Sequence, residues 1–213
     1  MAVRKGIQPE VFPFYDYRRQ SLSLAVQKGD YLFVSGHTAS EYDSETKKMV
    51  CKGNMAEQAR VSYQKIKLLL ETAGGTLDDV IKLTEYIAPI GIGDYPVVDE
   101  VKRQYFGNNL PVISPIGVHN LLRPGAFMEV EAVAVLGKDK HRLDAEPLYS
   151  EKLAAPKAVR TGDLLFIAGQ CGKDDKTGRI IGEGDVVAQA EQTYRNIKAT
   201  LEKAGATFAD VVK

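Results

Sequence analysis

Glu129, in the segment MEVEA, is a candidate for acid–base chemistry. Glu129 and Glu131 alternate along this segment, so they point to the same face of an extended strand. A carboxylate in such a place can hold a water molecule or carry a proton. The alternative is a purely structural carboxylate, buried at a subunit contact and satisfied by a partner's donors.

A second candidate group lies earlier in the chain, at the end of the segment GDYLFVSGH. Gly36 can present its backbone N–H to a ligand, although close strand packing explains a glycine equally well. A histidine side chain ordinarily titrates near neutral pH, so His37 is a candidate acid or base, with a structural hydrogen-bonding role as the alternative. His119, in the loop HNLLRPG, and His141 are expected at the surface.

The sequence lacks the spacings that are typical of metal and nucleotide sites. Its 3 histidines and 2 cysteines are scattered, with neither an i, i+4 pair of histidines nor a Cys-x-x-Cys motif. The glycines between residues 172 and 184 match no phosphate-binding pattern, and no Ser-His-Asp arrangement can be argued. We therefore expect no metal and no cofactor.

The elements that must position these side chains indicate an α+β fold. The apolar stripe of the first helix repeats at three- and four-residue steps, Asn54 can cap its start, and Gly74-Gly75 ends it. The segment 127–136 becomes continuously apolar, which predicts a strand in the centre of its sheet. The expected elements are a hairpin (24–27 and 31–35), a charged loop (41–48), a helix (56–71), a strand (80–87), a helix (94–106) and two strands (111–118 and 127–136). The expected stripe consists of Ala56, Ala59, Tyr63, Ile66, Lys67 and Leu70.

Two helices can cover only one face of such a sheet. The other face carries alternating Val, Ala and Glu side chains, so we expect a neighbouring subunit or a second copy of the module to cover it. The amino-terminal residues 1–22 are polar and are expected to be irregular.

The chain repeats itself. Residues 58–82 (QARVSYQKIKLLLETAGGTLDDVIK) and 189–213 (QAEQTYRNIKATLEKAGATFADVVK) align without a gap and are identical at more than half of the positions, and GDYLFVSGH matches GDLLFIAGQ. This predicts an extension (1–22), a first domain (23–137), a linker (138–152) and a second domain (153–213) that contains only the hairpin and the first helix. Two explanations of the short second copy stay open: an incomplete sequence, or a half-domain that needs a partner surface.

These motifs resemble the RidA (YjgF) family, also called L-PSP endoribonucleases or reactive intermediate deaminases. The hairpin, the helix-Ala-Gly-x-Thr turn, LPVISPIGV and RPGAFMEVEAVAV match in order and spacing. The resemblance implies a chorismate-mutase-like domain, three of which form a barrel-like trimer with small-molecule clefts between neighbours. It also implies cofactor-free hydrolysis of 2-aminoacrylate-type enamines and imines, and, for a tandem chain, a trimer-like ring or a hexamer.

The resemblance assigns site residues and exposes one departure. Glu129 would position water as the catalytic residue, and Gly36, His37 and Ser114 would help to bind the substrate. The family's carboxylate-binding arginine, in a Pro-x-Arg-Ser motif, is replaced here by Ile113. An isoleucine side chain has no donors with which to bind a carboxylate.

A tyrosine of the family is also absent. Leu22 in the first copy and Ala155 in the second occupy its place, and Tyr15 and Tyr17 match it only with a shift in register. Arg123 is interpreted as part of a turn.

Composition limits the partners. Lys+Arg and Asp+Glu both number 28, and this balance argues against a nucleic-acid surface built from bulk charge. No apolar run is long enough for a membrane span, and no secretory signal or disulfide framework is recognisable, so a cytoplasmic protein is expected.

Three functions follow in order of preference. The first is hydrolytic deamination of a small enamine, imine or amino-substituted unsaturated acid, with a substrate that differs from the ordinary 2-imino acids because of Ile113. The second is a non-catalytic domain that binds a metabolite or assembles the ring. The third is an endoribonuclease or translation inhibitor, as the family's older name suggests.

Overall fold

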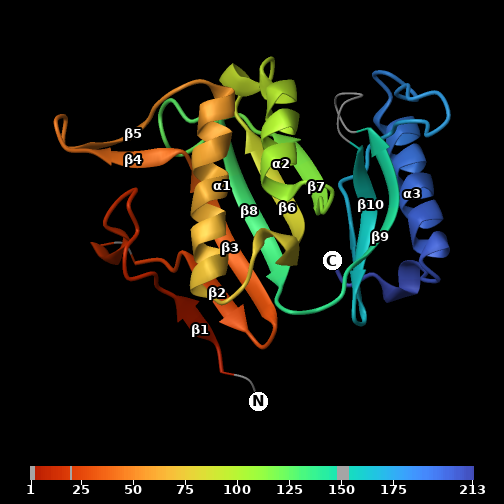
Figure 1. Cartoon of the computed structure of the whole chain (residues 1–213). Helices are drawn as coiled ribbons and strands as arrows, with labels where there is room; N and C mark the ends of the chain where they lie inside the picture. The colour runs from red at the N-terminus through yellow and green to blue at the C-terminus, as the bar shows by residue number, and fades with distance from the viewer. Residues whose placement is uncertain (1–2, 20, 148–153) are drawn as a thin grey trace.

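The computed structural model describes residues 3–19, 21–147 and 154–213. The first module is one six-stranded sheet with two helices on one face (Figure 1). The sheet order is β1-β2-β3-β8-β6-β7, in which only β6 and β7 run parallel. The strands are β1 (Lys5–Ile7), β2 (Ala25–Lys28), β3 (Tyr31–Thr38), β6 (Val80–Ile87), β7 (Val112–Gly117) and β8 (Met128–Val135). The expected α+β architecture, hairpin and central last strand are thereby confirmed.

Helix α1 (Met55–Thr72) begins and ends where the sequence predicts. Asn54 and Glu57 form a capping box, each side chain accepting from the other's backbone N–H, and Gly74 follows with a left-handed φ of 82°. The predicted buried stripe is wrong at one position: Lys67 is exposed, whereas Lys65 is fully buried. Its ammonium donates to the carbonyl oxygens of Thr38 (2.8 Å) and Ser40.

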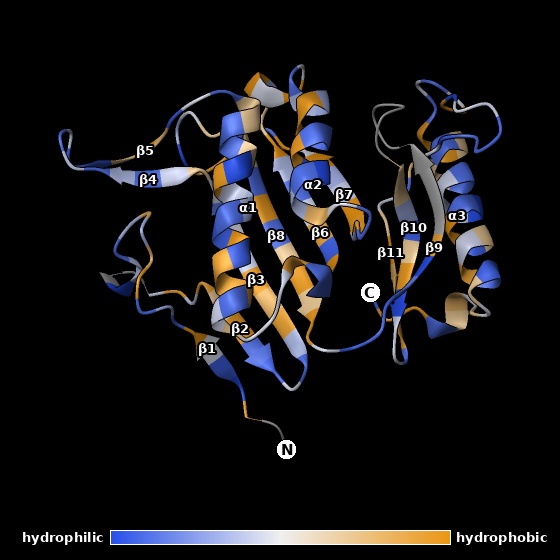
Figure 2. Cartoon of the chain, viewed as in Figure 1, coloured by the Kyte–Doolittle hydropathy of each residue, from blue (hydrophilic) through white to orange (hydrophobic). Residues whose placement is uncertain are grey.

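The main core lies between the helices and the sheet, where apolar side chains of α1, α2 (Val98–Phe106) and the strands meet. Figure 2 shows hydrophobic residues, in orange, along these helices and strands. Tyr63, Ile66 and Leu69 of α1 are completely buried there. Helix α2 is preceded by a short 3-10 turn, η4 (Tyr95–Val97), so the expected helix over 94–106 is divided in two. The other 3-10 turns are η1 (Tyr17–Arg19), η2 (Leu77–Asp79), η3 (Pro89–Gly91) and η5 (Phe208–Asp210).

The expected charged loop at 41–48 is instead part of a separate hairpin. Strands β4 (Ser40–Asp43) and β5 (Lys48–Cys51) pair with each other and project away from the sheet (Figure 1). Asp43 closes the turn by accepting from the N–H groups of Glu45 and Thr46. The loop prediction was wrong because most residues of these two strands are neither fully buried nor fully exposed, so the charged segment lacks the usual apolar–polar alternation.

The second module contains a three-stranded antiparallel sheet, β11-β10-β9, and one long helix. Its elements are β9 (His141–Pro147), β10 (Ala154–Thr161), β11 (Leu164–Ile167) and α3 (Val186–Lys203). Strand β9 pairs with β10 just as β1 pairs with β2. The predicted extension and linker were therefore wrong in part, because each contains the first strand of its module; residues 148–152 of that linker lie outside the described residues.

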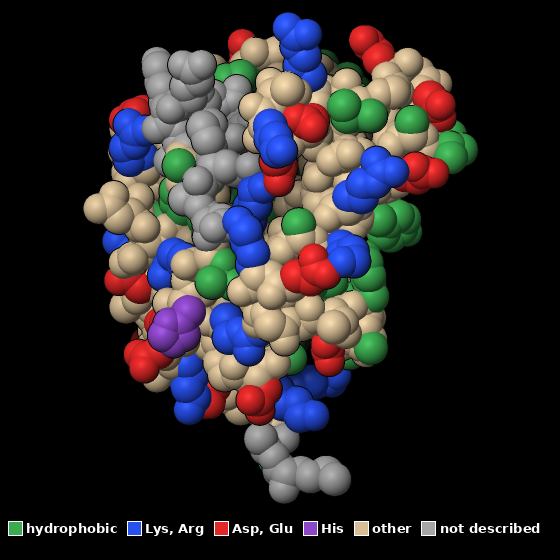
Figure 3. All heavy atoms as spheres, turned by 90° about the vertical axis from the view of Figure 1, so that its right-hand side faces the viewer, with side chains coloured by type: hydrophobic (Ala, Val, Ile, Leu, Met, Phe, Trp, Pro, Cys, Tyr) green, Lys and Arg blue, Asp and Glu red, His purple; other side chains and the backbone are tan. Residues whose placement is uncertain are grey.

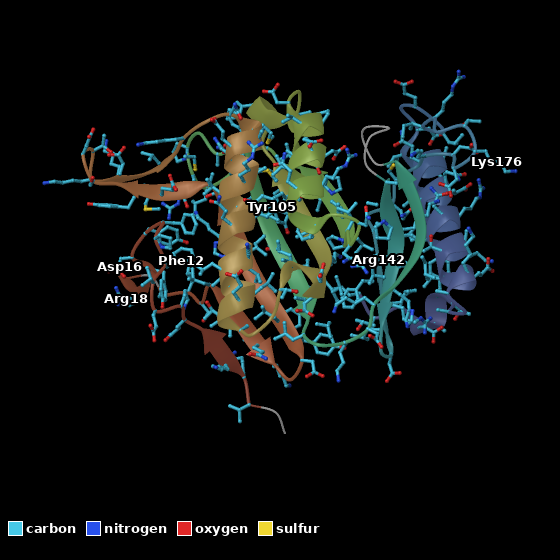
Figure 4. The ribbon with its side chains drawn as sticks, in the orientation of Figure 1. Phe12, Asp16, Arg18, Tyr105, Arg142 and Lys176 are labelled. Atoms are coloured by element: carbon cyan, nitrogen blue, oxygen red, sulfur yellow. The ribbon has the colours of Figure 1, made fainter. Side chains whose placement is uncertain are left out.

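The second module packs on the sheet face that the helices leave open. Val159 and Ala168 join Ile81, Val112 and Val135 in a second apolar cluster. Arg142 of β9 extends this contact by donating from Nε to Leu110 O and from Nη2 to Asn109 O, both 2.9 Å (Figure 4). These contacts cover the part of the sheet face around β7 and the end of β8.

Candidate functional site

The centre of the candidate site is an irregularity in β3. The pairing of β3 with β8 shifts between Val34 and His37, and Gly36 lies within this bulge. The carboxylate of Glu129 rests directly on Gly36: a Cβ at that glycine would come within 2.0 Å of Glu129 Oε1. The two residues that the sequence singled out for chemistry are thus in contact, and only a glycine leaves room for the carboxylate in this position.

Neighbouring groups change the acidity of Glu129. Partial burial raises the pKa of its carboxyl group above the ordinary value, the negative charge of Glu131 raises it further, and the positive charge of Arg123 partly offsets both. Glu131 itself accepts a hydrogen bond of 3.2 Å from the hydroxyl of Tyr86 on β6. A half-buried carboxyl with a raised pKa is suited to take up and release a proton.

The charge of Arg123 influences three titratable groups, one of which is Glu129. Burial raises the pKa values of Tyr15, near the amino terminus, and of the Cys51 thiol on β5. The positive charge of Arg123 opposes this rise in part at both groups, as it does at Glu129. Sequence reasoning assigned Arg123 to a turn, set Tyr15 aside because of a register shift, and gave Cys51 no role, since none of the three has a motif of its own.

His37 belongs to the opposite side of the sheet. It pairs with the core residue Val130, and its ring lies 6.3 Å from that of Phe12. Burial, together with the charge of Lys65, lowers its pKa to about 4. Its Nε2 atom has no hydrogen-bond partner among the described residues. A buried, neutral imidazole cannot serve as an acid near pH 7, and its place in the core separates it from Glu129.

Ile113 and Ser114 point to opposite faces of β7. Ile113 is completely buried in the main core, so its side chain is closed to a ligand in this chain. Ser114 faces the second module, where its Oγ accepts a hydrogen bond of 2.9 Å from the backbone N–H of Gly169. Gly169 is the second copy's counterpart of Gly36, so Ser114 lies at the junction of the modules rather than beside Glu129.

A buried polar network escaped the sequence analysis. Glu85 of β6 accepts from the hydroxyls of Tyr63 (2.5 Å) and Tyr95 and pairs with Lys102 Nζ at 3.0 Å. Lys102 also lies 3.5 Å from Asp99. The side chains of Glu85 and Lys102 are fully buried, so the network joins α1, α2 and β6 as a structural unit. A lysine inside the apolar stripe of α2 is the signal that could have revealed it.

The described part of the chain contains no group of three or more His, Cys, Asp and Glu side chains placed to hold a metal ion. Two shallow hollows, of about 170 and 290 Å³, lie instead along the amino-terminal segment around Tyr17 and Arg18. Asp16 and Arg18 mark this region in Figure 4, where they lie far from the second module. In the described segments, no helix is long and apolar enough to cross a membrane.

Comparison with known proteins decides the family. The profile described as Endoribonuclease L-PSP matches residues 18–136 and again 141–213. The chain belongs to the L-PSP endoribonuclease family. The first match includes β2, β3 and α1, and the second includes β9, β10, β11 and α3.

Relatives within the L-PSP family carry two kinds of name. A RutC family protein of Pyrococcus abyssi is 35% identical over 112 residues, which are 53% of this chain and 84% of the relative. The human 2-iminobutanoate/2-iminopropanoate deaminase is 30% identical over 115 residues, which are 54% of this chain and 80% of that protein. Each relative therefore corresponds to about half of this chain.

Solved structures also match somewhat more than half of this chain. A protein from Pseudomonas aeruginosa superposes with a TM-score of 0.53 and 27% identity, covering 64% of this chain and 95% of its own. Escherichia coli TdcF, crystallised with bound serine, gives a TM-score of 0.50 and 26% identity, covering 62% and 98%.

Proposed function

We propose that the chain hydrolyses small imines and enamines to carbonyl compounds and ammonia, with Glu129 as the group that moves protons. The observation that carries the proposal is the half-buried Glu129 carboxyl, whose pKa is raised and whose position on Gly36 is fixed. Relatives at about 30% identity that are named 2-iminobutanoate/2-iminopropanoate deaminases support the same chemistry.

The reaction needs proton transfers that one carboxyl can supply. As a carboxylate, Glu129 accepts a proton from water while the water oxygen bonds to the imine carbon. When the substrate is a protonated imine, this addition gives the neutral carbinolamine, and Glu129 returns the proton to its nitrogen. The C–N bond then breaks while the Glu129 carboxylate accepts the hydroxyl proton, so the carbonyl forms, and that proton passes to the departing ammonia, which leaves as ammonium. A pKa above the ordinary carboxyl value makes the protonated form more accessible at neutral pH, which favours the return of the proton.

Assembly belongs to the same proposal. Phe33 and Ile116 lie on the open side of the sheet beyond the second module, with exposed fractions of 51% and 43%. We expect these side chains to be covered in a trimer-like ring of modules, which would enclose Glu129 and exclude bulk water. Light scattering with size-exclusion chromatography tests this part of the proposal.

The second candidate, a metabolite-binding or assembly role without catalysis, is favoured by Ile113 in place of the family's arginine. The endoribonuclease alternative finds less support. On the face of the second module, Lys/Arg and Asp/Glu side chains are interspersed rather than gathered by sign (Figure 3). A basic stripe is the usual electrostatic footprint of RNA binding.

The deciding experiment measures hydrolysis of an imine that an amino-acid oxidase generates in situ, with semicarbazide as the trap for unreacted imine. We expect the protein to lower the semicarbazone yield and the variant Glu129→Gln to lose this effect. Glutamine keeps the shape but cannot carry the proton. If neither protein changes the yield for several imines, and both are folded and assembled alike, the binding role replaces the enzymatic one.

A further inference from the structure

We infer that Tyr86 is a positioning residue of the Glu129 site: its hydroxyl holds Glu131 beside Glu129, and this second carboxylate regulates when Glu129 carries a proton. The inference rests on the proposed function, because it concerns the regulation of that same site. Tyr86 acts through Glu131 and needs no contact with the substrate.

Strand register brings the three side chains to one face of the sheet. Tyr86 of β6 pairs directly with Glu129 of β8, and Glu129 pairs on its other side with Thr38 of β3. The side chains of directly opposite residues point to the same face. Glu131 comes two positions later on β8 and therefore returns to that face, about 7 Å further along the strand.

The hydroxyl of Tyr86 sets the direction of the Glu131 side chain. Glu131 lies directly opposite Thr84 in the ladder, yet its Oε2 accepts a hydrogen bond of 3.2 Å from Tyr86, which is two positions further along β6. The carboxylate therefore leans diagonally toward the row that contains Glu129. Glu131 is exposed, and an exposed glutamate without such a bond distributes its charge over many rotamers.

Glu129 has a defined direction as well, because its carboxylate lies on Gly36. Two like charges about 7 Å apart in water change each other's proton affinity about two- to threefold. This agrees with the raised pKa of Glu129, to which burial contributes most and the charge of Glu131 next. Burial and the charges of both glutamates also raise the pKa of Tyr86, so the phenol keeps the proton that it donates.

Other titratable groups approach the two carboxylates from three further places. They are Arg123 in the turn before β8, Lys82 of β6 and the Cys51 thiol of β5. The arginine opposes the rise in the pKa of Glu129, the lysine lies within electrostatic reach of Glu131, and the thiol contacts Thr38 Oγ1 at 4.0 Å. All three groups stay in place when only the Tyr86 hydroxyl is removed, so Tyr86→Phe isolates its contact with Glu131.

The test follows the titration of the Glu129 carboxyl carbon by NMR, with the signal assigned by its loss in Glu129→Gln. Tyr86→Phe and Glu131→Gln should each lower the proton affinity of Glu129 about two- to threefold, and their combination should lower it no further than Glu131→Gln alone. At about 1 M salt the differences should shrink, because salt screens the two charges. Tyr42→Phe, at an exposed position of the β4–β5 hairpin, is the matched control and should titrate as the wild type does.

An unchanged titration in Tyr86→Phe, or an additional shift in the combined variant, overturns the inference. Kinetics keeps it separable from the proposed function. If Glu129 is the base, the acidic limb of the pH profile of kcat/KM should move to lower pH in Tyr86→Phe by the same factor. Imine hydrolysis with an unmoved limb leaves the proposed function intact and rejects the role of Tyr86. Absence of hydrolysis defeats the proposed function, and the NMR titration still decides whether Tyr86 controls the proton affinity of Glu129.

Discussion

The carboxylate of Glu129 lies on the α-carbon of Gly36, where a methyl group would approach Oε1 to 2.0 Å. This contact joins a bulge of β3 to the neighbouring strand β8 and sets the direction of the proposed catalytic side chain. Since the clashing atoms belong to the flexible end of Glu129, the fold can tolerate a methyl group there while the site cannot.

Gly36→Ala should therefore displace the carboxylate and leave the protein folded. We expect the thermal midpoint to change by no more than about 4 °C, which corresponds to about 1 kcal/mol or less of stability lost. A misplacement of about 1 Å can lower a rate by about 100-fold. Gly93→Ala is the matched control, because nothing lies within 4 Å of its added methyl group. Imine hydrolysis by Gly36→Ala at the wild-type rate would contradict the geometry.

Glu129 also makes stability depend on pH. Its folded pKa is raised, so the folded chain holds a proton that the unfolded chain releases, and stability decreases as the pH rises from the unfolded value through the folded one. Glu129→Gln should raise the free energy of unfolding at pH 7 by less than about 1 kcal/mol, since water partly screens the group. The gain should vanish at pH 3.5. Urea denaturation at both values measures it, and an advantage that persists at low pH would refute the explanation.

His37 makes stability depend on pH in the opposite direction. Its folded pKa of about 4 lies below the ordinary 6.5, so the unfolded chain binds the additional proton and stability is lost as the pH falls between these values. His37→Gln should remove about 3 kcal/mol of the difference in unfolding free energy between pH 7.5 and pH 4. His119→Gln, at an exposed position, is the control. The same pH dependence in wild type and His37→Gln would show that the imidazole is accessible to protons in the fold.

The buried pair of Lys102 and Glu85 predicts a large loss of stability. Lys102→Met leaves Glu85 buried beside Asp99 without a cation, which should cost about 3–5 kcal/mol. Arg103→Met, one residue later on the exposed side of α2, should cost no more than about 1 kcal/mol. Chemical denaturation of the two variants compares them. A similar, small loss in both would mean that the core lets water reach Glu85.

A substitution at Ser114 distinguishes a role in the contact between the two modules from a role in substrate binding. Ser114→Ala removes the acceptor of the Gly169 N–H, a hydrogen bond worth about 1 kcal/mol, so exchange of that amide should accelerate by about fivefold. Thr84→Ala, at the paired position on β6, should leave the exchange unchanged. Hydrogen exchange read by NMR resolves the single amide. If exchange is unaltered while KM for the imine rises, Ser114 binds substrate and the contact between the modules is secondary.

Several elements were predictable because their causes are local. The capping box of Asn54 and Glu57, the glycine after α1 and the alternation of β6 each depend on residues a few positions apart. Strands β1 and β9 were missed because their pairing partners, rather than their own composition, make them strands. The burial of Lys65 was missed for a similar reason, since its acceptors are carbonyl groups more than 20 residues away.

The sequence by itself determined the α+β order, the repeated module and the two residues, Gly36 and Glu129, that meet at the candidate site. Periodicity, turn chemistry and internal similarity are properties of neighbouring residues, so they survive without coordinates. Only the tertiary structure decided that His37 and Ile113 face the core, that Ser114 meets Gly169, and that Arg123 acts on Glu129. Which face a side chain occupies, and which distant charge it meets, depends on strand register and on the anchoring of a loop, and these are fixed only when the sheet assembles.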